Sequence, residues 1–395
     1  MNNISIFIKK EFILLMILFI VFINPFFYGY RIAMIFFVFM FFKVKYFLSN
    51  VDKNALYLFL FSFSYEILAA LRLDALNTSL VPMLPNIFVP SLLYLIGKYI
   101  SNNYKGDQGR IFFLFFLSTI FSIIPLFSIL LQIQENGFME GTRSLYLIWD
   151  KNFEISATGL GSYFALNMAS IGLINVNKNT KVERRIALGI FILFLLSLVC
   201  VLRLGSRTQL VLAIFSLVGS FLLNISQNSL FKNALFIGSL TALTFYLISI
   251  FNENADVVKF YADRMDNDEA GIGSAGGRTE RWIGALESIV SDPFGWELSR
   301  FGYAHNLWLD VARVAGVIPF ILLLFFTVSS IKIWIKSLRI LRNNLFLRNY
   351  VFIYFLCIIL LFNVEPIMDG MYLLFLLFCL YVGFLNGIII RKFNL

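Results

Sequence analysis

The fold class follows from residues 186–224, which read IALGIFILFLLSLVCVLRLGSRTQLVLAIFSLVGSFLLN. The two apolar runs in this stretch, 186–203 and 208–224, each approach the ~20 apolar residues that a helix needs to cross a lipid bilayer. Only the short polar segment Gly205-Ser206-Arg207-Thr208 separates them. The stretch therefore predicts two membrane-spanning helices joined by a tight turn, with an arginine where the second helix enters the membrane.

The same pattern extends over the whole chain of 395 residues. Hydrophobic residues make up 59% of it and charged residues 14%, about half of the ~25% that is usual in soluble domains. This composition excludes a soluble globular domain, a disordered chain and a disulfide-rich secreted module. Long apolar runs also exclude an outer-membrane barrel, whose short strands alternate polar and apolar residues. We predict an all-α polytopic membrane protein, with residues 1–395 forming one transmembrane domain.

Twelve apolar runs predict about twelve spans. They lie at 12–23, 26–42, 55–73, 86–100, 111–131, 157–175, 186–203, 208–224, 231–251, 306–330, 350–363 and 371–390. The first run follows Lys9 and Lys10, as in a signal peptide, but no cleavage pattern of small residues comes after it. We therefore expect it to remain as the first span.

The distribution of lysine and arginine predicts the orientation. If the N-terminus is inside and the spans alternate, most basic residues fall in cytoplasmic segments, where acidic residues are few. This is the positive-inside bias of membrane proteins, and it places both termini in the cytoplasm. It also explains the net charge of +9. No nucleic-acid motif is present, so no nucleic-acid partner is expected.

The longest non-apolar segment, 252–304, lies between the ninth and tenth predicted spans and is expected on the outer side of the membrane. Loops of this length are usually functional or disordered. Within it, Trp282, Ala285, Leu286 and Ile289 have helical i, i+3, i+4 and i+7 spacing, which predicts an amphipathic helix of about 14 residues. Arg278 falls near the centre of its apolar face.

Three residues of unusual chemistry fall on this outer side, namely Arg207, Arg278 and His305, the only histidine. Each has an ordinary explanation, because an arginine can snorkel to lipid headgroups and a histidine can cap a helix. Together they indicate chemistry: arginine binds phosphate oxygens bidentately, and a neutral imidazole can act as a general base. Weaker candidates are Arg203, Arg281, Arg300, Asn306 and Arg143, and a set at one span end, Glu66, Arg72 and Asp74.

The motifs around these residues resemble those of the bacterial O-antigen polymerase and O-antigen ligase superfamily. They are Ser206-Arg207, Gly277-Arg278-Thr279-Glu280-Arg281-Trp282, Asp292-Pro293-Phe294-Gly295, His305-Asn306-Leu307-Trp308-Leu309 and Ala315-Gly316-Val317. The resemblance covers about 203–320, and elsewhere only hydropathy is similar. Two departures are Arg313, where relatives often have an acidic or neutral residue, and 296–303, which lacks the usual glycine-rich run.

The resemblance implies a glycosyltransferase of the bacterial inner membrane whose active site faces the periplasm and uses no metal or cofactor. It implies that the donor is an oligosaccharide linked to undecaprenyl diphosphate. Arg207 and Arg278 would bind the diphosphate and His305 would be catalytic. Membrane lipids and a chain-length regulator are the other expected partners.

Three functions remain open at this point. A polymerase joins repeat units on the lipid carrier, whereas a ligase moves finished polymer to the lipid A core of lipopolysaccharide, and the same chemistry serves both. We favour the polymerase. The alternative from another class is a flippase for lipid-linked sugars. Transporters, however, hold charged sites near the bilayer midplane, where most of the predicted spans lack charges.

Overall fold

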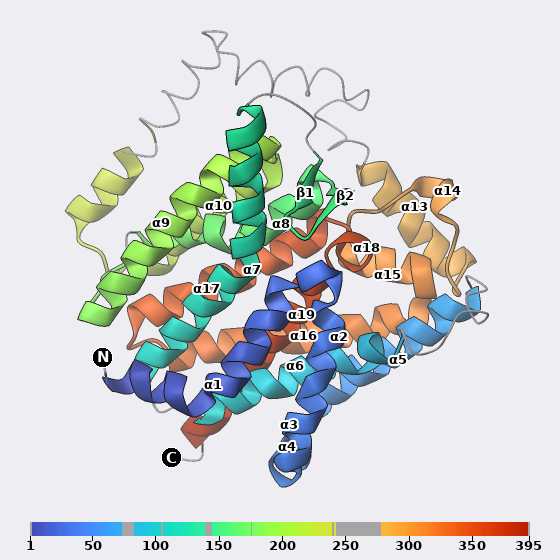
Figure 1. Ribbon diagram of the computed structural model, residues 1–395, viewed down its shortest axis with the longest axis horizontal. Helices are drawn as coiled ribbons and strands as arrows, with labels where there is room; N and C mark the ends of the chain where they lie inside the picture. The colour runs from blue at the N-terminus through green and yellow to red at the C-terminus, as the bar shows by residue number, and fades with distance from the viewer. Residues whose placement is uncertain are drawn as a thin grey trace.

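The computed structural model describes residues 2–72, 83–103, 106–138, 144–174, 176–238, 241 and 278–393. These residues form a bundle of helices (Figure 1), and the predicted class of polytopic helical membrane protein is confirmed. One element departs from the all-α prediction. Residues Leu145–Leu147 (β1) and Asp150–Ile155 (β2) pair as an antiparallel hairpin.

Eight helices in the described part of the chain are long and apolar enough to cross a membrane. They are α5 (Lys53–Arg72), α6 (Met83–Asn103), α7 (Asp107–Asn136), α9 (Lys181–Leu204), α10 (Arg207–Asn224), α16 (Val317–Ile340), α17 (Leu345–Val364) and α19 (Tyr372–Phe393). A ninth is reached if the bent pair Gly29–Phe42 and Val44–Asn50 is one span. The expected number of twelve is therefore not confirmed.

Three predicted spans differ from the structure for separate reasons, and a fourth lies mostly outside the described residues. Helix α1 (Asn2–Ile23) kinks at Glu11, and its charged first half leaves too short an apolar run. The predicted span 26–42 is broken into η1 (Pro25–Phe27), α2 (Gly29–Ile32), η2 (Ala33–Ile35) and α3 (Phe36–Phe42), and α4 (Val44–Asn50) follows at 101°. The predicted span 157–175 is the short helix α8 (Ala157–Ala169) followed by η4 (Ser170–Leu173). Of 231–251, only 231–238 and 241 are described.

The predicted span 306–330 is divided into two helices. Residues Leu307–Ala315 form α15 and the span α16 begins at Val317, because Gly316 between them has a φ of 81°. This left-handed conformation ends a helix and is adopted readily by glycine. The break leaves α15 at the end of the bundle and moves the span ten residues toward the C-terminus.

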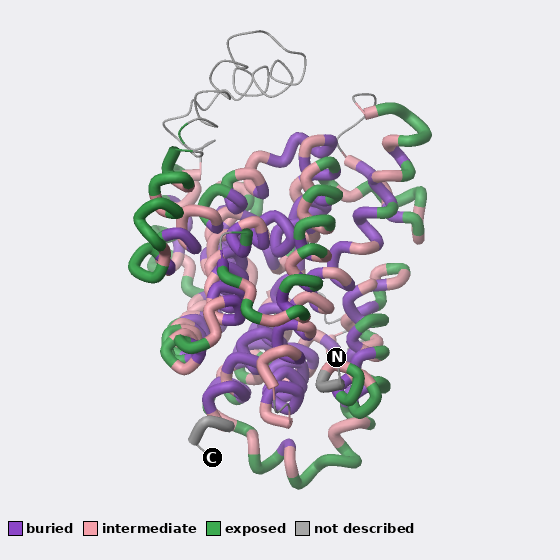
Figure 2. The backbone as a smooth tube through the Cα atoms, turned by 90° about the vertical axis from the view of Figure 1, so that its left-hand side faces the viewer, coloured by how far each residue is buried: buried purple, intermediate pink, exposed green. Residues whose placement is uncertain are grey.

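The centre of the bundle is the pair α6 and α19, which make the most extensive contact of any two elements. Gly97 and Gly383 lie in this seam, where a Cβ atom would meet the backbone of the opposite helix. Small residues of this kind let membrane helices approach closely. Helix α19 is the most buried of the eight candidate spans, and the buried backbone fills the middle of the bundle (purple in Figure 2).

Short helices cover one end of the bundle, on the side away from the two chain termini (Figure 1). They are α13 (Arg278–Ser291), α14 (Leu298–Phe301), α15 and α18 (Ile367–Gly370). Helix α15 contacts α13 and α18 as well as the spans α5, α16 and α17. It therefore joins the described part of the long loop, 278–304, to the membrane-spanning bundle.

Candidate active site

Helix α13 packs on the end of the bundle through an apolar face, as its sequence pattern predicts. A small core of Ala285, Trp296, Ala304, Leu309 and Ala312 joins it to α15, with Trp282 and Ile289 packed against this core. The prediction is wrong for Leu286, which is 55% exposed. Gly284 and Ser288 are buried instead, so the buried face of α13 is rotated toward its small residues, which permit a closer approach.

Backbone hydrogen bonds join two motifs that are separated in the sequence. Trp296 N–H donates to the carbonyl of Arg313 at 3.0 Å, and Val317 N–H donates to the carbonyl of Pro293 at 2.8 Å. Gly295 has a φ of 103° and lies against the Arg313 carbonyl. The segment Asp292-Pro293-Phe294-Gly295 is therefore fastened to the break between α15 and α16.

His305 lies in a turn that side chains from two helices hold in place. One carboxylate oxygen of Asp310 accepts from Ala304 N–H at 2.9 Å, and the other accepts from Asn306 N–H at 3.2 Å. On the opposite side, the Trp282 indole donates to the Ala304 carbonyl at 2.7 Å. These bonds hold His305 at a φ of 51°, a region that non-glycine residues seldom occupy and that recurs at functional sites.

The imidazole of His305 is half-buried beside two cations. Burial is the main cause that lowers its pKa from 6.5 to about 4, and the charges of Arg278 and Arg281 lower it further. The ring is therefore neutral at pH 7. Its Nδ1 atom is buried and makes no hydrogen bond to the described residues. A neutral ring with an unbonded nitrogen can accept a proton from a bound group.

Glu365 joins the start of α10 to the same neighbourhood. It follows α17, is only 2% exposed, and accepts a hydrogen bond from Thr208 Oγ1 at 3.0 Å. Burial raises the pKa of its carboxyl to about 7, while Thr208 and the charge of Arg278 act to lower it. The charge of Arg278 thus acts on both His305 and Glu365, and the bond from Thr208 links the start of α10 to the same neighbourhood.

Arg207 is the first residue of α10, next to the Thr208 that bonds Glu365. A tight turn precedes it, in which Gly205 N–H donates to Leu202 at 3.0 Å and Ser206 N–H donates to Val201 at 3.2 Å. This turn reverses the chain between α9 and α10, as the sequence predicts. The side chain of Arg207 is half-buried, at the end of the helix where backbone N–H groups favour anions.

The weaker candidates differ in their surroundings. Arg300 is exposed and pairs with Asp292 at 2.5 Å, so it is a surface charge of the loop. Asn306 caps α15, because its side-chain oxygen accepts from Leu309 N–H at 3.2 Å. Arg203 is buried in the last turn of α9. Arg143 and Asp74 lie outside the described residues.

Arg72, in the set of ions at the end of α5, pairs with residues of the loop and of α15. Arg72 bonds to the carbonyls of Arg313 and Val314, and its charged partner is Glu297 at 3.3 Å. It therefore fastens α5 to the C-terminal end of α15, where an arginine satisfies carbonyls that the helix leaves free.

Sequence reasoning missed the acidic residues that support this site. Arg313 donates to Asp369 at 2.9 Å and lies 3.8 Å from Asp310. Burial raises the pKa of both carboxyls, that of Asp310 to about 6. A usable signal was present for Asp310, since an acid four residues after Asn306 can reach back to the N-terminal end of its helix. Glu365 and Asp369 are far from the motifs in sequence, so only the fold reveals them.

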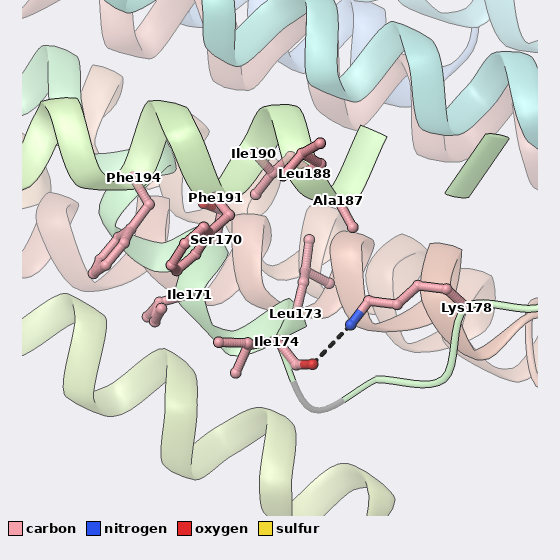
Figure 3. A pocket seen from close by; sticks show the side chains of 10 residues that line it. All are labelled: Ser170, Ile171, Leu173, Ile174, Lys178, Ala187, Leu188, Ile190, Phe191 and Phe194. Atoms are coloured by element: carbon pink, nitrogen blue, oxygen red, sulfur yellow. Dashed lines mark hydrogen bonds between the residues drawn. The ribbon is translucent and has the colours of Figure 1, made fainter. Parts of the chain in front are cut away.

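Outside this site, the described residues form an apolar pocket but no group of side chains that could hold a metal ion. Within the described ranges, no three His, Cys, Asp or Glu side chains are grouped so as to hold a metal ion. An apolar pocket of about 270 Å³ lies between η4 and α9 (Figure 3) and is lined mainly by isoleucine, leucine and phenylalanine. Lys178 lies at its edge and donates to the carbonyl of Ile174 at 2.7 Å. None of the candidate residues lines this pocket.

In comparisons with known proteins, no family model matches this chain and no curated protein is significantly similar to it.

Proposed function

We propose that this protein is a glycosyltransferase of the bacterial inner membrane that polymerises O-antigen or a related surface polysaccharide at the periplasmic face. The donor is a glycan linked to undecaprenyl diphosphate, and the acceptor is a sugar hydroxyl. The observation that carries the proposal is the neutral imidazole of His305, held in a rigid turn beside the charges of Arg278 and Arg281. The orientation follows from the distribution of basic residues along the chain.

The arginines bind the diphosphate of the donor. Arg278 is half-buried beside His305, and Arg207 begins a helix whose second residue is bonded to Glu365. Guanidinium groups bind phosphate oxygens bidentately, and fixed cations stabilise a leaving group as its charge develops. Arg281 adds a second positive charge near the imidazole. These charges favour departure of undecaprenyl diphosphate.

His305 accepts the proton in the transfer step. The acceptor oxygen attacks the anomeric carbon, the bond from that carbon to the diphosphate oxygen breaks, and the diphosphate leaves with the bonding electrons. The hydroxyl proton moves to the imidazole. Because the bound diphosphate offsets the positive charges of the arginines, it returns the pKa of His305 toward 6.5, closer to the optimum for a general base at neutral pH. The base is therefore strengthened when the donor is bound.

The test is polymer formation by the purified protein in nanodiscs, with carrier-linked repeat units extracted from cells that lack the gene. The wild type should yield a ladder of products. His305→Ala should lower the rate by about 10²–10⁴, the usual size of general-base catalysis, with normal expression. Arg300→Ala is the matched control, because Arg300 is exposed and pairs with Asp292, and it should remain active. A normal product ladder from His305→Ala would remove this residue from the mechanism.

A deletion strain separates the polymerase from its rivals. Loss of a polymerase leaves lipopolysaccharide with a single repeat, whereas loss of a ligase leaves polymer on the carrier. Transport of carrier-linked sugar across a vesicle membrane without formation of a glycosidic bond would identify a flippase instead.

A further inference from the structure

Glu365 has a hydrogen-bonding capacity that the proposed reaction does not yet use. One of its carboxylate oxygens accepts from Thr208 at 3.0 Å. The other, Oε2, is buried and has no hydrogen-bond partner, and it is the only carboxylate oxygen in this condition among the described residues. Leaving such a buried oxygen without a partner destabilises the protein, because its lost hydration is not replaced. A group that donates a hydrogen bond therefore fits at this position.

The neighbouring acids differ in this respect. Both oxygens of Asp310 accept backbone N–H groups, and Asp369 is paired with Arg313 at 2.9 Å. Those two carboxylates hold the protein's own parts together. Glu365 is as buried as Asp310, at 2% against 1% exposed, but one of its oxygens remains free to bind another molecule.

We propose that Glu365 is the hydroxyl-binding residue of this site, and that its free oxygen accepts a hydrogen bond from a hydroxyl group of a sugar substrate. The inference rests on the proposed glycosyl transfer and adds the part of the site that recognises the sugar. The ionised form of Glu365, which predominates above its pKa of about 7, repels a diphosphate, which has oxygen acceptors and no strong donor, whereas a sugar hydroxyl donates to it readily. Arginines and glutamate thus bind opposite parts of the substrate and fix its direction.

The free oxygen of Glu365 lies close to the surface of the site. Thr208, which bonds the other oxygen, is half-buried rather than buried, and so is Arg278, whose charge acts on the carboxyl. The carboxylate therefore lies one side chain below the surface of the site.

The test uses Glu365→Gln, which keeps an oxygen for Thr208 and replaces the free oxygen by an amide NH2 group. Three quantities are measured with the purified full-length protein in nanodiscs. They are the Kd for undecaprenyl diphosphate alone, the KM for extracted carrier-linked repeat as donor, and the KM for a carrier-free repeat oligosaccharide as acceptor. Thr208→Val is the companion variant, since it removes only the hydrogen bond to the other oxygen.

We expect Glu365→Gln to raise one of the two KM values by about 10- to 100-fold, the effect of losing a hydrogen bond to a charged group. The Kd for undecaprenyl diphosphate should not weaken. A rise in the acceptor KM assigns the hydroxyl to the acceptor sugar, and a rise in the donor KM assigns it to the donor sugar. In either case the change should exceed that caused by Thr208→Val.

Unchanged KM values in a folded Glu365→Gln protein would overturn the inference, and so would an equal effect of Thr208→Val. Failure of the proposed function would look different, because the wild type itself would then form no polymer or would not bind undecaprenyl diphosphate.

Discussion

His305 owes its conformation to neighbours rather than to its own preference. Its φ of 51° costs of order 1–3 kcal/mol, and the bonds from Asp310 and Trp282 to the adjoining residues offset this cost. These bonds restrain the backbone on both sides of His305. A base held in this way loses little entropy when the acceptor hydroxyl arrives.

Asp310→Asn tests this support. The amide has one accepting oxygen in place of two, so one of the N–H groups of Ala304 and Asn306 loses its partner. We expect a loss of about 1–3 kcal/mol in stability, seen as a lower Tm, and a lower kcat with unchanged binding of undecaprenyl diphosphate. Asp292→Asn, at an exposed acid that bonds Arg300, should leave both quantities near the wild type. Equal Tm and kcat in Asp310→Asn and wild type would contradict the role.

The protonation of His305 can be followed directly, because it is the only histidine in the chain. In protein prepared without a histidine tag, NMR of the imidazole nitrogens should give a pKa well below 6.5, near 4. Arg281→Gln removes one of the charges that lower the pKa, so the titration should move to higher pH. Saturating undecaprenyl diphosphate should move it in the same direction.

Arg300→Gln serves as the control for that titration, since the guanidinium is paired with Asp292 and should not affect the imidazole. If Arg281→Gln gave the same pKa as the wild type and Arg300→Gln, Arg281 would have to lie farther from His305 than the structure indicates.

At the scale of elements, the apolar runs predicted the long spans well and the broken ones poorly. Hydropathy identifies α9 and α10 because each is one uninterrupted apolar run between polar turns. It joined α15 to α16, since a single glycine carries no hydropathy signal although its backbone ends the helix. The hairpin was missed because Leu145–Leu147 is too short to show a clear alternation.

The Thr208–Glu365 bond depends on the packing of α10 against α17. A single sequence does not reveal which helices pack together, so this bond could not be predicted.

The break at Gly316 gives a test at this scale. A methyl group there would meet the carbonyl of Pro293, and the backbone at φ 81° is strained for any other residue. Gly316→Ala should therefore lower the Tm and the transfer rate together, because the break places α15 and the His305 turn. Gly302 has a similar φ of 71° but open space around it. Gly302→Ala reports the backbone strain alone, and a loss as large as that of Gly316→Ala would show that contact with Pro293 is unimportant.

At the scale of the whole molecule, the short helices α13, α15 and α18 lie at one end of the bundle, away from the termini (Figure 1). The distribution of basic residues predicts that this end faces the periplasm. The native thiols Cys200, Cys357 and Cys379 are all buried, so they should contribute little background to surface labelling. Orientation can therefore be tested with introduced cysteines in the wild-type sequence.

Arg300→Cys and Arg342→Cys form the matched pair for labelling, because both positions are exposed and lie on opposite sides of the span α16. A membrane-impermeant maleimide added to intact cells with a permeable outer membrane should label Arg300→Cys. It should label Arg342→Cys only after the inner membrane is opened. The reverse pattern would invert the orientation and place the site in the cytoplasm.

The seam between α6 and α19 has a consequence for biogenesis. Helix α6 is synthesised early, and α19 is synthesised near the end of the chain. The surface of α6 at Gly97 therefore lacks its packing partner at Gly383 during most of translation. The insertion machinery or a chaperone must shield this surface of α6 until synthesis is nearly complete. A nonsense codon before Tyr372 should therefore give a product that is degraded by quality-control proteases, even though His305 and its arginines have already been translated.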